Sequence, residues 1–223
     1  MAIKDTERYD KLKKGFCDTL LGTNREGMSE LLEHLENAGF FTDPARASYG
    51  CAYWGGLLEY SVDVYARMRV KREQEPLWVK ALANVSPETV AIVSLLHAIG
   101  RTGQFEQTVV NRKNRDPEYI TAVAASSPNK IKTDAEGSFV WEEAKGYRYV
   151  DTTPFGDGER SVIMALRYIR LTDEEIEAIG CHKGFAAPGR TSPVSDVFGR
   201  NPLALALYEA SLEATYVVER DKI

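Results

Sequence analysis

Cysteine is scarce in this sequence, and the pattern of the three that occur excludes two classes of protein. Cys17, Cys51 and Cys181 are odd in number and lie far apart in the chain. They cannot form the disulfide framework that holds many small secreted domains together, and they contain no CxxC pair of the kind found in zinc ribbons. We therefore interpret all three as small, buried hydrophobic side chains.

Long apolar runs are also missing. The longest, residues 90–99, is interrupted by Ser94 and His97 and falls well short of the 20 or so residues that a bilayer-spanning helix needs. Residues 1–16 are rich in charged side chains and have no apolar core, so we expect no signal peptide. The sequence predicts a soluble, cytoplasmic protein that does not associate with a membrane.

An excess of positive charge is absent as well. The chain has 28 Lys and Arg against 33 Asp and Glu, for a net charge of −5. This balance disfavours a general nucleic-acid coat without excluding a local basic site. With 223 residues, 43% of them hydrophobic, the chain can bury a substantial core. No linker is evident, so we expect a single domain over residues 1–223.

What the sequence does contain is helical periodicity. Apolar side chains recur at helical spacing in residues 23–40, 55–74, 86–100, 161–170, 172–182 and 201–219. Ser86 before Pro87 is a strong signal for a helix start, and Thr172 forms a capping box with Glu175. The fold class predicted from this pattern is all-α, a helical bundle.

Three segments depart from the pattern. Residues 111–117 are polar and basic and are expected to form a loop, as are the Gly-, Pro- and Ser-rich residues 184–200, which are long enough to line a site. In residues 139–151, aromatic and β-branched residues flank Lys145 and Gly146. This arrangement predicts a small β-hairpin insertion with its turn at that pair.

Four blocks of sequence carry a resemblance to a known family. They are GGLLEYSVDVY (55–65), SLLHAIGRTGQF (94–105), PFGDGERSVIMALRYIRLTDEEIEAI with GCHKGF (154–185), and NPLALALYEASLEATYVVE (201–219). In order and spacing these blocks resemble the HD-domain superfamily, in its branch of prokaryotic and mobile-element hydrolases. The resemblance covers roughly residues 40–219 and leaves 1–39 as an N-terminal helical extension. It implies an HD-like helical bundle of the metal-dependent phosphohydrolase type.

The metal ligands implied by the resemblance are largely replaced. Carried over by position, the core ligands fall at Tyr60, His97, Ala98 and Ser211, and the outer histidines at Gly50, Asp157 and His182. Tyrosine, alanine and serine are poor ligands at neutral pH because the phenol and hydroxyl remain protonated. We therefore expect a degenerate metal site, no bound cofactor and no confident catalytic residue.

The leading hypothesis for function is a pseudoenzyme whose pocket persists as a binding or regulatory module. The pocket residues that we expect to converge are Tyr60, His97, Arg101, Asp157, His182, Lys183 and Ser211. Arg101 lies four residues after His97, which would place both on one helix face, and its guanidinium suits phosphate. The expected ligand is a small anion or a nucleotide; nucleic acid is disfavoured as a partner but not excluded, and the sequence does not identify a protein partner.

Alternatives remain open at this stage. His97, Asp157 and His182 could form a rebuilt three-ligand site for Mn, Mg, Fe or Zn in a divergent phosphohydrolase. The pocket could instead be vestigial in an interaction scaffold. Taken singly, His97 could be a buried histidine bonded to Tyr60, His182 a helix cap, and Lys183 an ordinary solvated lysine.

Two further groups have both a functional and a structural interpretation. The basic run Arg112, Lys113 and Arg115 either approaches the pocket mouth or forms a solvated loop. The aromatic residues Trp54, Trp141 and Tyr149 either stack on a base or pack within the core and hairpin.

Overall fold

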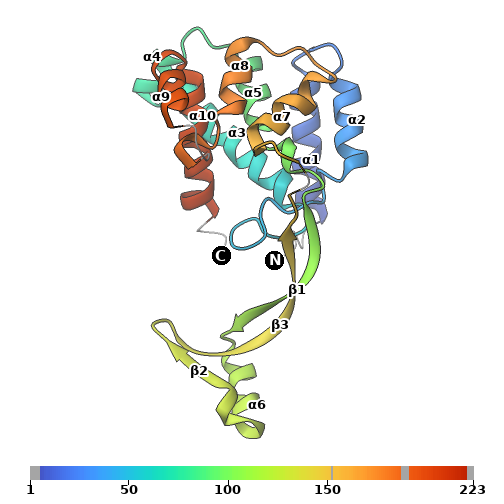
Figure 1. Cartoon of the computed structure of the whole chain (residues 1–223), viewed down its shortest axis with the longest axis vertical. Helices are drawn as coiled ribbons and strands as arrows, with labels where there is room; N and C mark the ends of the chain where they lie inside the picture. The colour runs from blue at the N-terminus through green and yellow to red at the C-terminus, as the bar shows by residue number, and fades with distance from the viewer. Residues whose placement is uncertain (1–5, 152, 187–190, 220–223) are drawn as a thin grey trace.

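The computed structural model describes residues 6–151, 153–186 and 191–219, and Figure 1 shows a helical body from which a β arm projects. The body contains α1 (Thr6–Leu21), α2 (Met28–Ala38), α3 (Gly56–Gln74), α4 (Pro76–Ala81), α5 (Pro87–Leu96), η1 (Ile99–Arg101), α7 (Asp157–Leu166), α8 (Asp173–Gly180), η3 (Gly184–Ala186), α9 (Thr191–Arg200), α10 (Pro202–Glu213) and the π-helical turn η4 (Ala214–Val218). The arm contains β1 (Phe105–Asn114), α6 (Pro117–Ser126), η2 (Pro128–Lys130), β2 (Ile131–Asp134) and β3 (Gly137–Tyr149).

Local capping signals place the helix ends of the body. The Ser86 side chain accepts a hydrogen bond from the backbone N–H of Thr89, and Thr172 and Glu175 cap each other's backbone N–H groups. The helix start at Pro87 and the capping box before α8 are therefore confirmed. α2 ends where Gly39 takes a left-handed conformation, with φ of 95°.

The core of the body lies around α3, which contacts both α5 and α10. Every residue from Val90 to Leu96 of α5 is buried. A helix that is apolar on all sides is expected to lie inside a bundle, and α5 does so. α7 and α8 pack together on this centre, and α8 also contacts α5 and α10.

The arm contradicts the predicted all-α class. Its three strands form an antiparallel sheet in the order β1-β3-β2, so the chain combines a mostly helical body with a separate sheet. β1 and β3 pair over ten positions, from Phe105 opposite Tyr149 to Asn114 opposite Val140. The sheet is larger than the expected hairpin insertion and joins segments more than 20 residues apart.

The turn predicted at Lys145 and Gly146 is wrong. β3 runs straight through both residues, and Gly146 pairs with Thr108 of β1. A Cβ atom at position 146 would lie 2.5 Å from Cγ2 of Val110, so glycine relieves crowding within the sheet. The β2–β3 turn falls instead just before Gly137, which has φ of +116°.

Both predicted loops are also partly wrong. Residues 111–114 belong to β1, and α6 then begins at Pro117, with the Asp116 side chain accepting the N–H of Glu118. Within 184–200 the chain forms η3 and α9, and residues 187–190 lie outside the described part. Helix boundaries shift as well: α2 begins at Met28 and not at residue 23, and α5 ends at Leu96 and not at residue 100. α7 begins at Asp157, one turn earlier than expected, and α10 ends at Glu213.

The predictions about membrane-spanning helices and about the cysteines can both be compared with the described residues. None of the helices in these ranges is long and apolar enough to cross a bilayer. The three cysteines are free thiols; Cys51 is buried as predicted, whereas Cys17 and Cys181 are only half-buried.

Candidate functional site

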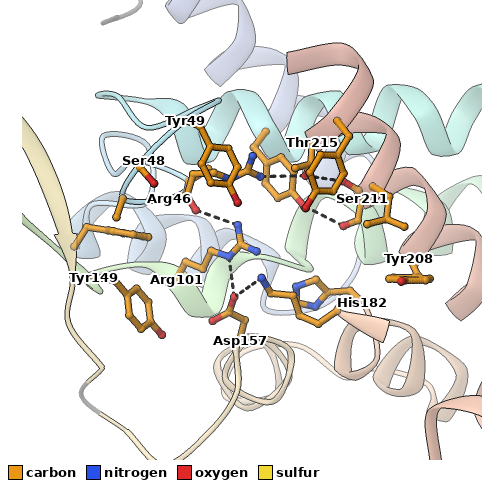
Figure 2. A pocket seen from close by; sticks show the side chains of 17 residues that line it. Arg46, Ser48, Tyr49, Arg101, Tyr149, Asp157, His182, Tyr208, Ser211 and Thr215 are labelled. Carbon is orange, nitrogen blue, oxygen red and sulfur yellow. Dashed lines mark hydrogen bonds and ion pairs between the residues drawn. The ribbon is translucent and has the colours of Figure 1, made fainter. Parts of the chain in front are cut away.

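A cavity of about 550 Å³ opens in the helical body beside the root of the arm (Figure 2). The expected pocket residues that line it are Tyr60, Arg101, Asp157, His182, Lys183 and Ser211. His97 does not line the cavity but is fully buried next to it, with its ring centroid 5.2 Å from that of Tyr60 and 5.0 Å from that of His182. The structure therefore brings together all seven residues, which come from distant parts of the sequence.

The segment from His97 to Arg101 is positioned by α7. The Gly100 N–H donates to Oγ of Ser161 over 2.9 Å, and this hydroxyl is also 2.7 Å from the carbonyl oxygen of His97. A Cβ atom at Gly100 would lie 2.6 Å from the backbone oxygen of Asp157, so only glycine allows this approach. α5 ends before His97, and Arg101 therefore reaches the cavity from η1, not from the helix face that the spacing suggested.

Asp157 is the centre of an ionic network at the cavity wall (Figure 2). One carboxylate oxygen lies 3.0 Å from Nε of Arg101 and 3.2 Å from Nζ of Lys183, and the other accepts a hydrogen bond from Arg160 over 2.9 Å. Arg101 also donates to the carbonyl oxygen of Ala45. Lys183 thus has an ion-pair partner and is not the ordinary solvated lysine of the alternative interpretation.

Electrostatics favour the ionised forms of this network. Burial raises the pKa of the Asp157 carboxyl, but the charges of Arg101 and Lys183 outweigh it and hold that pKa well below its usual range. Burial and the nearby Arg101 lower the pKa of the Lys183 ammonium to about 8. Near neutral pH, Arg101 and Lys183 therefore place two positive charges in the cavity wall against the one negative charge of Asp157. Arg46, described next, is a third cation of the wall.

Arg46 is a cavity residue that the sequence did not reveal. Its guanidinium donates to Glu219 over 2.6 Å and to Thr215 over 3.1 Å, and lies 5.0 Å from the centroid of the Tyr60 ring. The nearest sequence signal was Gly50, whose φ is +54° and where a Cβ atom would lie 1.7 Å from a Glu219 oxygen. A side chain at position 50, where the resemblance places an outer histidine, would therefore displace the Glu219 carboxylate.

Arg160 joins the cavity to the arm. Besides Asp157, its guanidinium donates to Gln104 over 2.9 Å and to the Tyr149 hydroxyl over 2.7 Å. Tyr149 and Phe105 are opposite each other at the root of the β1–β3 ladder, and both line the cavity. The root of the arm is therefore part of the cavity wall.

His97 and His182 are buried and neutral. Nδ1 of His97 lies 2.6 Å from the Ser94 carbonyl oxygen, and Nδ1 of His182 lies 2.8 Å from that of Ile179. Each Nδ1 therefore carries the proton, and neither Nε2 has a hydrogen-bond partner among the described residues. Burial lowers the pKa of both rings, that of His182 to about 3, so both are neutral at pH 7.

The single-residue alternatives for these positions have mixed outcomes. His182 bonds a carbonyl near the end of α8, as the capping interpretation expects. The expected hydrogen bond between His97 and Tyr60 is not formed. The Tyr60 hydroxyl instead lies 3.0 Å from Oγ of Ser211 and meets His97 only through ring contact.

The donor set does not fit a divalent metal. Both carboxylate oxygens of Asp157 are engaged by cations, while the hydroxyls of Tyr60 and Ser211 are bonded to each other. Across the described ranges, no three His, Cys, Asp or Glu side chains are grouped so as to hold an ion. His97, Asp157 and His182 are close in space but are not arranged as a ligand set.

The basic run and the aromatic residues have separate positions. Lys113 is opposite Trp141, eight residues along β1 from the cavity, so the basic run does not approach the pocket mouth. Arg112 forms an ion pair with Glu142 of β3. Lys113 and Arg115 both pair with Asp134 of β2. Trp54 packs on Tyr9 with ring centroids 4.6 Å apart.

The rim of the cavity is aromatic. The rings that line it, in addition to Tyr60, belong to Tyr49, Phe105, Tyr149, Tyr208 and Tyr216. Tyr49 and Tyr216 are each 64% exposed and Tyr149 is 41% exposed, so each ring has surface accessible to a ligand, although Arg46 lies over Tyr49 and Arg160 over Tyr149. The site thus combines a cationic wall with a rim of flat rings. Comparison with protein-family models, with curated proteins and with solved structures gave no match to this chain.

Proposed function

We propose that the cavity binds a small phosphate-bearing, nucleotide-like ligand without turning it over, as a pseudoenzyme pocket in a binding or regulatory module of the cytoplasm. The observation that carries the proposal is the charge of the wall. Arg46, Arg101 and Lys183 face one cavity in which Asp157 is the carboxylate among the described lining residues, and Arg46 is also paired with Glu219 outside the lining. Guanidinium and ammonium groups held at a partly buried surface are suited to phosphate oxygens.

The nucleotide-like part of the proposal rests on the aromatic rim. A planar base can stack on rings such as Tyr49 and Tyr149 while its phosphate meets the cations. The proposal that the ligand is not turned over rests on the low basicity of the side chains in the cavity wall. The pKa of His182 is lowered to about 3 and that of Asp157 is held well below its usual range, so both are poor acceptors for a proton from water.

The first test measures ligand binding by thermal shift and calorimetry, with inorganic phosphate and adenosine 5′-monophosphate as probes. Lys183→Ala is the informative variant because its side chain is 43% exposed and has one ionic partner, so the fold should tolerate the change. Lys80→Ala, on the exposed side of α4, is the matched control. We expect saturable stabilisation of the wild type and of Lys80→Ala, and at least tenfold weaker binding by Lys183→Ala. If neither probe binds, the scaffold alternative replaces the proposal.

A second test addresses the relationship to HD-domain proteins, which is also a proposal. Its support is the contact of Tyr60 with both His97 and Ser211, three of the four core positions. Tyr60→His, Ala98→Asp and Ser211→Asp together rebuild the core set. With 1 mM Mn²⁺ and a Kd of about 10 µM, only the triple variant should gain about 2.7 kcal/mol, or roughly 5–11 °C.

Two results of these measurements would overturn the corresponding proposals. No metal-dependent rise in the folded triple variant contradicts the HD relationship. An equal rise in the wild type, with stoichiometric Mn, Fe or Zn found by elemental analysis and lost in His97→Ala, would establish the metal-dependent alternative in place of the pseudoenzyme.

A further inference from the structure

The two faces of the β1–β3 ladder differ sharply in composition. Because side chains alternate along a strand, every second pair in the register lies on the same face. The face that begins in the cavity, here called the aromatic face, contains the pairs Phe105–Tyr149, Gln107–Tyr147, Val109–Lys145, Asn111–Glu143 and Lys113–Trp141. The opposite face contains the pairs Glu106–Arg148, Thr108–Gly146, Val110–Ala144, Arg112–Glu142 and Asn114–Val140, none of them aromatic.

The aromatic face is accessible along its length. Tyr149 is 41% exposed, Val109 is 65% exposed and Trp141 is 52% exposed. Figure 1 shows this part of the arm extending away from the body, with α6 only near its far end. Exposed rings and aliphatic side chains on a projecting ribbon are costly unless they have a function.

Charge distinguishes the cavity end of the aromatic face from the rest of the ladder. On the opposite face, Arg148 pairs with Glu106, and Arg112 with Glu142, so its charges cancel within the sheet. On the aromatic face the ladder contributes Lys113 and Lys145 against Glu143, and Lys113 is paired with Asp134 of β2, so the charges along the ladder balance. The excess of cations lies where this face meets the cavity wall, at Arg101 and Lys183.

We infer that the aromatic face and the cavity form one continuous site for a single-stranded nucleic acid, with bases stacked on Tyr149, Tyr147 and Trp141 and a terminal phosphate at Arg101 and Lys183. A row of exposed rings that ends at a cationic wall suits single strands, whose bases are free to stack, whereas a duplex hides its base faces. The placement of the terminal phosphate rests on the proposed function; the stacking along the arm does not.

The length of the site sets the length of the ligand. Tyr149 and Trp141 are eight residues apart on β3, or roughly 26 Å at the rise of a strand. A strand of roughly four to eight nucleotides covers this distance, depending on how far it is stretched. With about three phosphates neutralised, the logarithm of affinity should fall with that of salt concentration at a slope of about −2.

The test is fluorescence anisotropy with labelled eight-nucleotide dT and rU strands, each with and without a phosphate at the unlabelled end, at 50 mM salt. We expect Trp141→Ala to weaken binding roughly 5- to 100-fold, the range for loss of one stacked base. Trp141→Phe should recover most of the loss. Tyr119→Ala removes a ring that is 39% exposed on α6, outside the ladder, and should leave binding unchanged.

The outcomes separate this site from the proposed function. Equal affinity of Trp141→Ala and wild type, or no binding of any strand at 50 mM salt while inorganic phosphate still binds, overturns the nucleic-acid site and leaves the anion pocket standing. If the terminal phosphate adds no affinity and Lys183→Ala has no effect, the cavity end is overturned. Self-association that Trp141→Ala abolishes, without strand binding, would make the arm a protein interface and would also overturn the inference.

Discussion

Replacing Arg101 by alanine should destabilise the body even without a ligand, because this guanidinium is 95% buried and bonded on several sides. The Ala45 carbonyl, 3.0 Å from Nη1, loses that donor, which costs about 1–3 kcal/mol. The cation also lies 5.3 Å from the centroid of the Tyr60 ring, a contact worth about 1–2 kcal/mol when partly desolvated.

The ion pair between Arg101 and Asp157 adds less to this loss of stability than its 3.0 Å distance suggests. Asp157 keeps Arg160 at 2.9 Å and Lys183 at 3.2 Å, so its charge is not left alone in the variant. We therefore expect a total loss of about 3–4 kcal/mol, which corresponds to a fall in Tm of roughly 6–16 °C for a domain of this size.

The assay is thermal unfolding followed by circular dichroism, with Arg69→Ala as the matched control. Arg69 is 55% exposed and pairs only with Glu73 one helical turn away, so its loss should cost about 0.5 kcal/mol or less. Arg101→Lys keeps the charge but not the geometry and should fall between the two. If Arg101→Ala lowers Tm no more than Arg69→Ala does, the reasoning from buried contacts is refuted.

Three further predictions concern pH and the arm. Because the pKa of the Lys183 ammonium is about 8, phosphate affinity should fall roughly tenfold as pH rises from 7.5 to 9.5, and Lys183→Ala should abolish this step in calorimetric titrations. The folded-state pKa of Asp157 is depressed, so its stabilisation is complete above the unfolded value of about 3.9 and is lost as pH falls below it. Asp157→Asn should therefore lower Tm by roughly 6–12 °C at pH 7, and this gap should narrow in melts below pH 4. Gly146→Ala forces a Cβ atom against Val110 and should reduce amide hydrogen-exchange protection in the arm, whereas Gly180→Ala, with open space around its Cβ position, should not.

The helices of the body were predictable because their signals are local. A capping serine before a proline, or a threonine three residues before a glutamate, determines a helix start within a few residues of sequence. The same kind of signal, Asp116 before Pro117, marks the start of α6, but it follows the polar, basic residues 111–115, which are typical of a loop.

The arm was not predictable from local pattern, for two physical reasons. β1 and β3 pair across an intervening segment of more than 20 residues, and no local signal specifies such a partner. Both faces of most of the ladder meet solvent, so the alternation of apolar and polar residues that identifies a half-buried strand is weak. Gly146 therefore resembled a turn residue, although it is required by the proximity of Val110.

The resemblance predicted which residues lie at the site, but not how they contact one another. The resemblance selected residues that do meet at one cavity, but the contacts of Asp157 with Arg101 and Lys183 depend on the packing of α7 against η1. Arg46 lies in an irregular loop outside the matched blocks, so only the three-dimensional structure assigns it to the wall.

Mechanically, the arm is a cantilever clamped at one end. Its ladder of ten pairs is roughly 33 Å long, and the clamp is the set of hydrogen bonds that Arg160 makes to Gln104, Tyr149 and Asp157. Each degree of rotation at the clamp displaces the free end by roughly 0.6 Å for that length. A rotation of about five degrees at the clamp would therefore displace the free end, which carries β2 and α6, by roughly 3 Å.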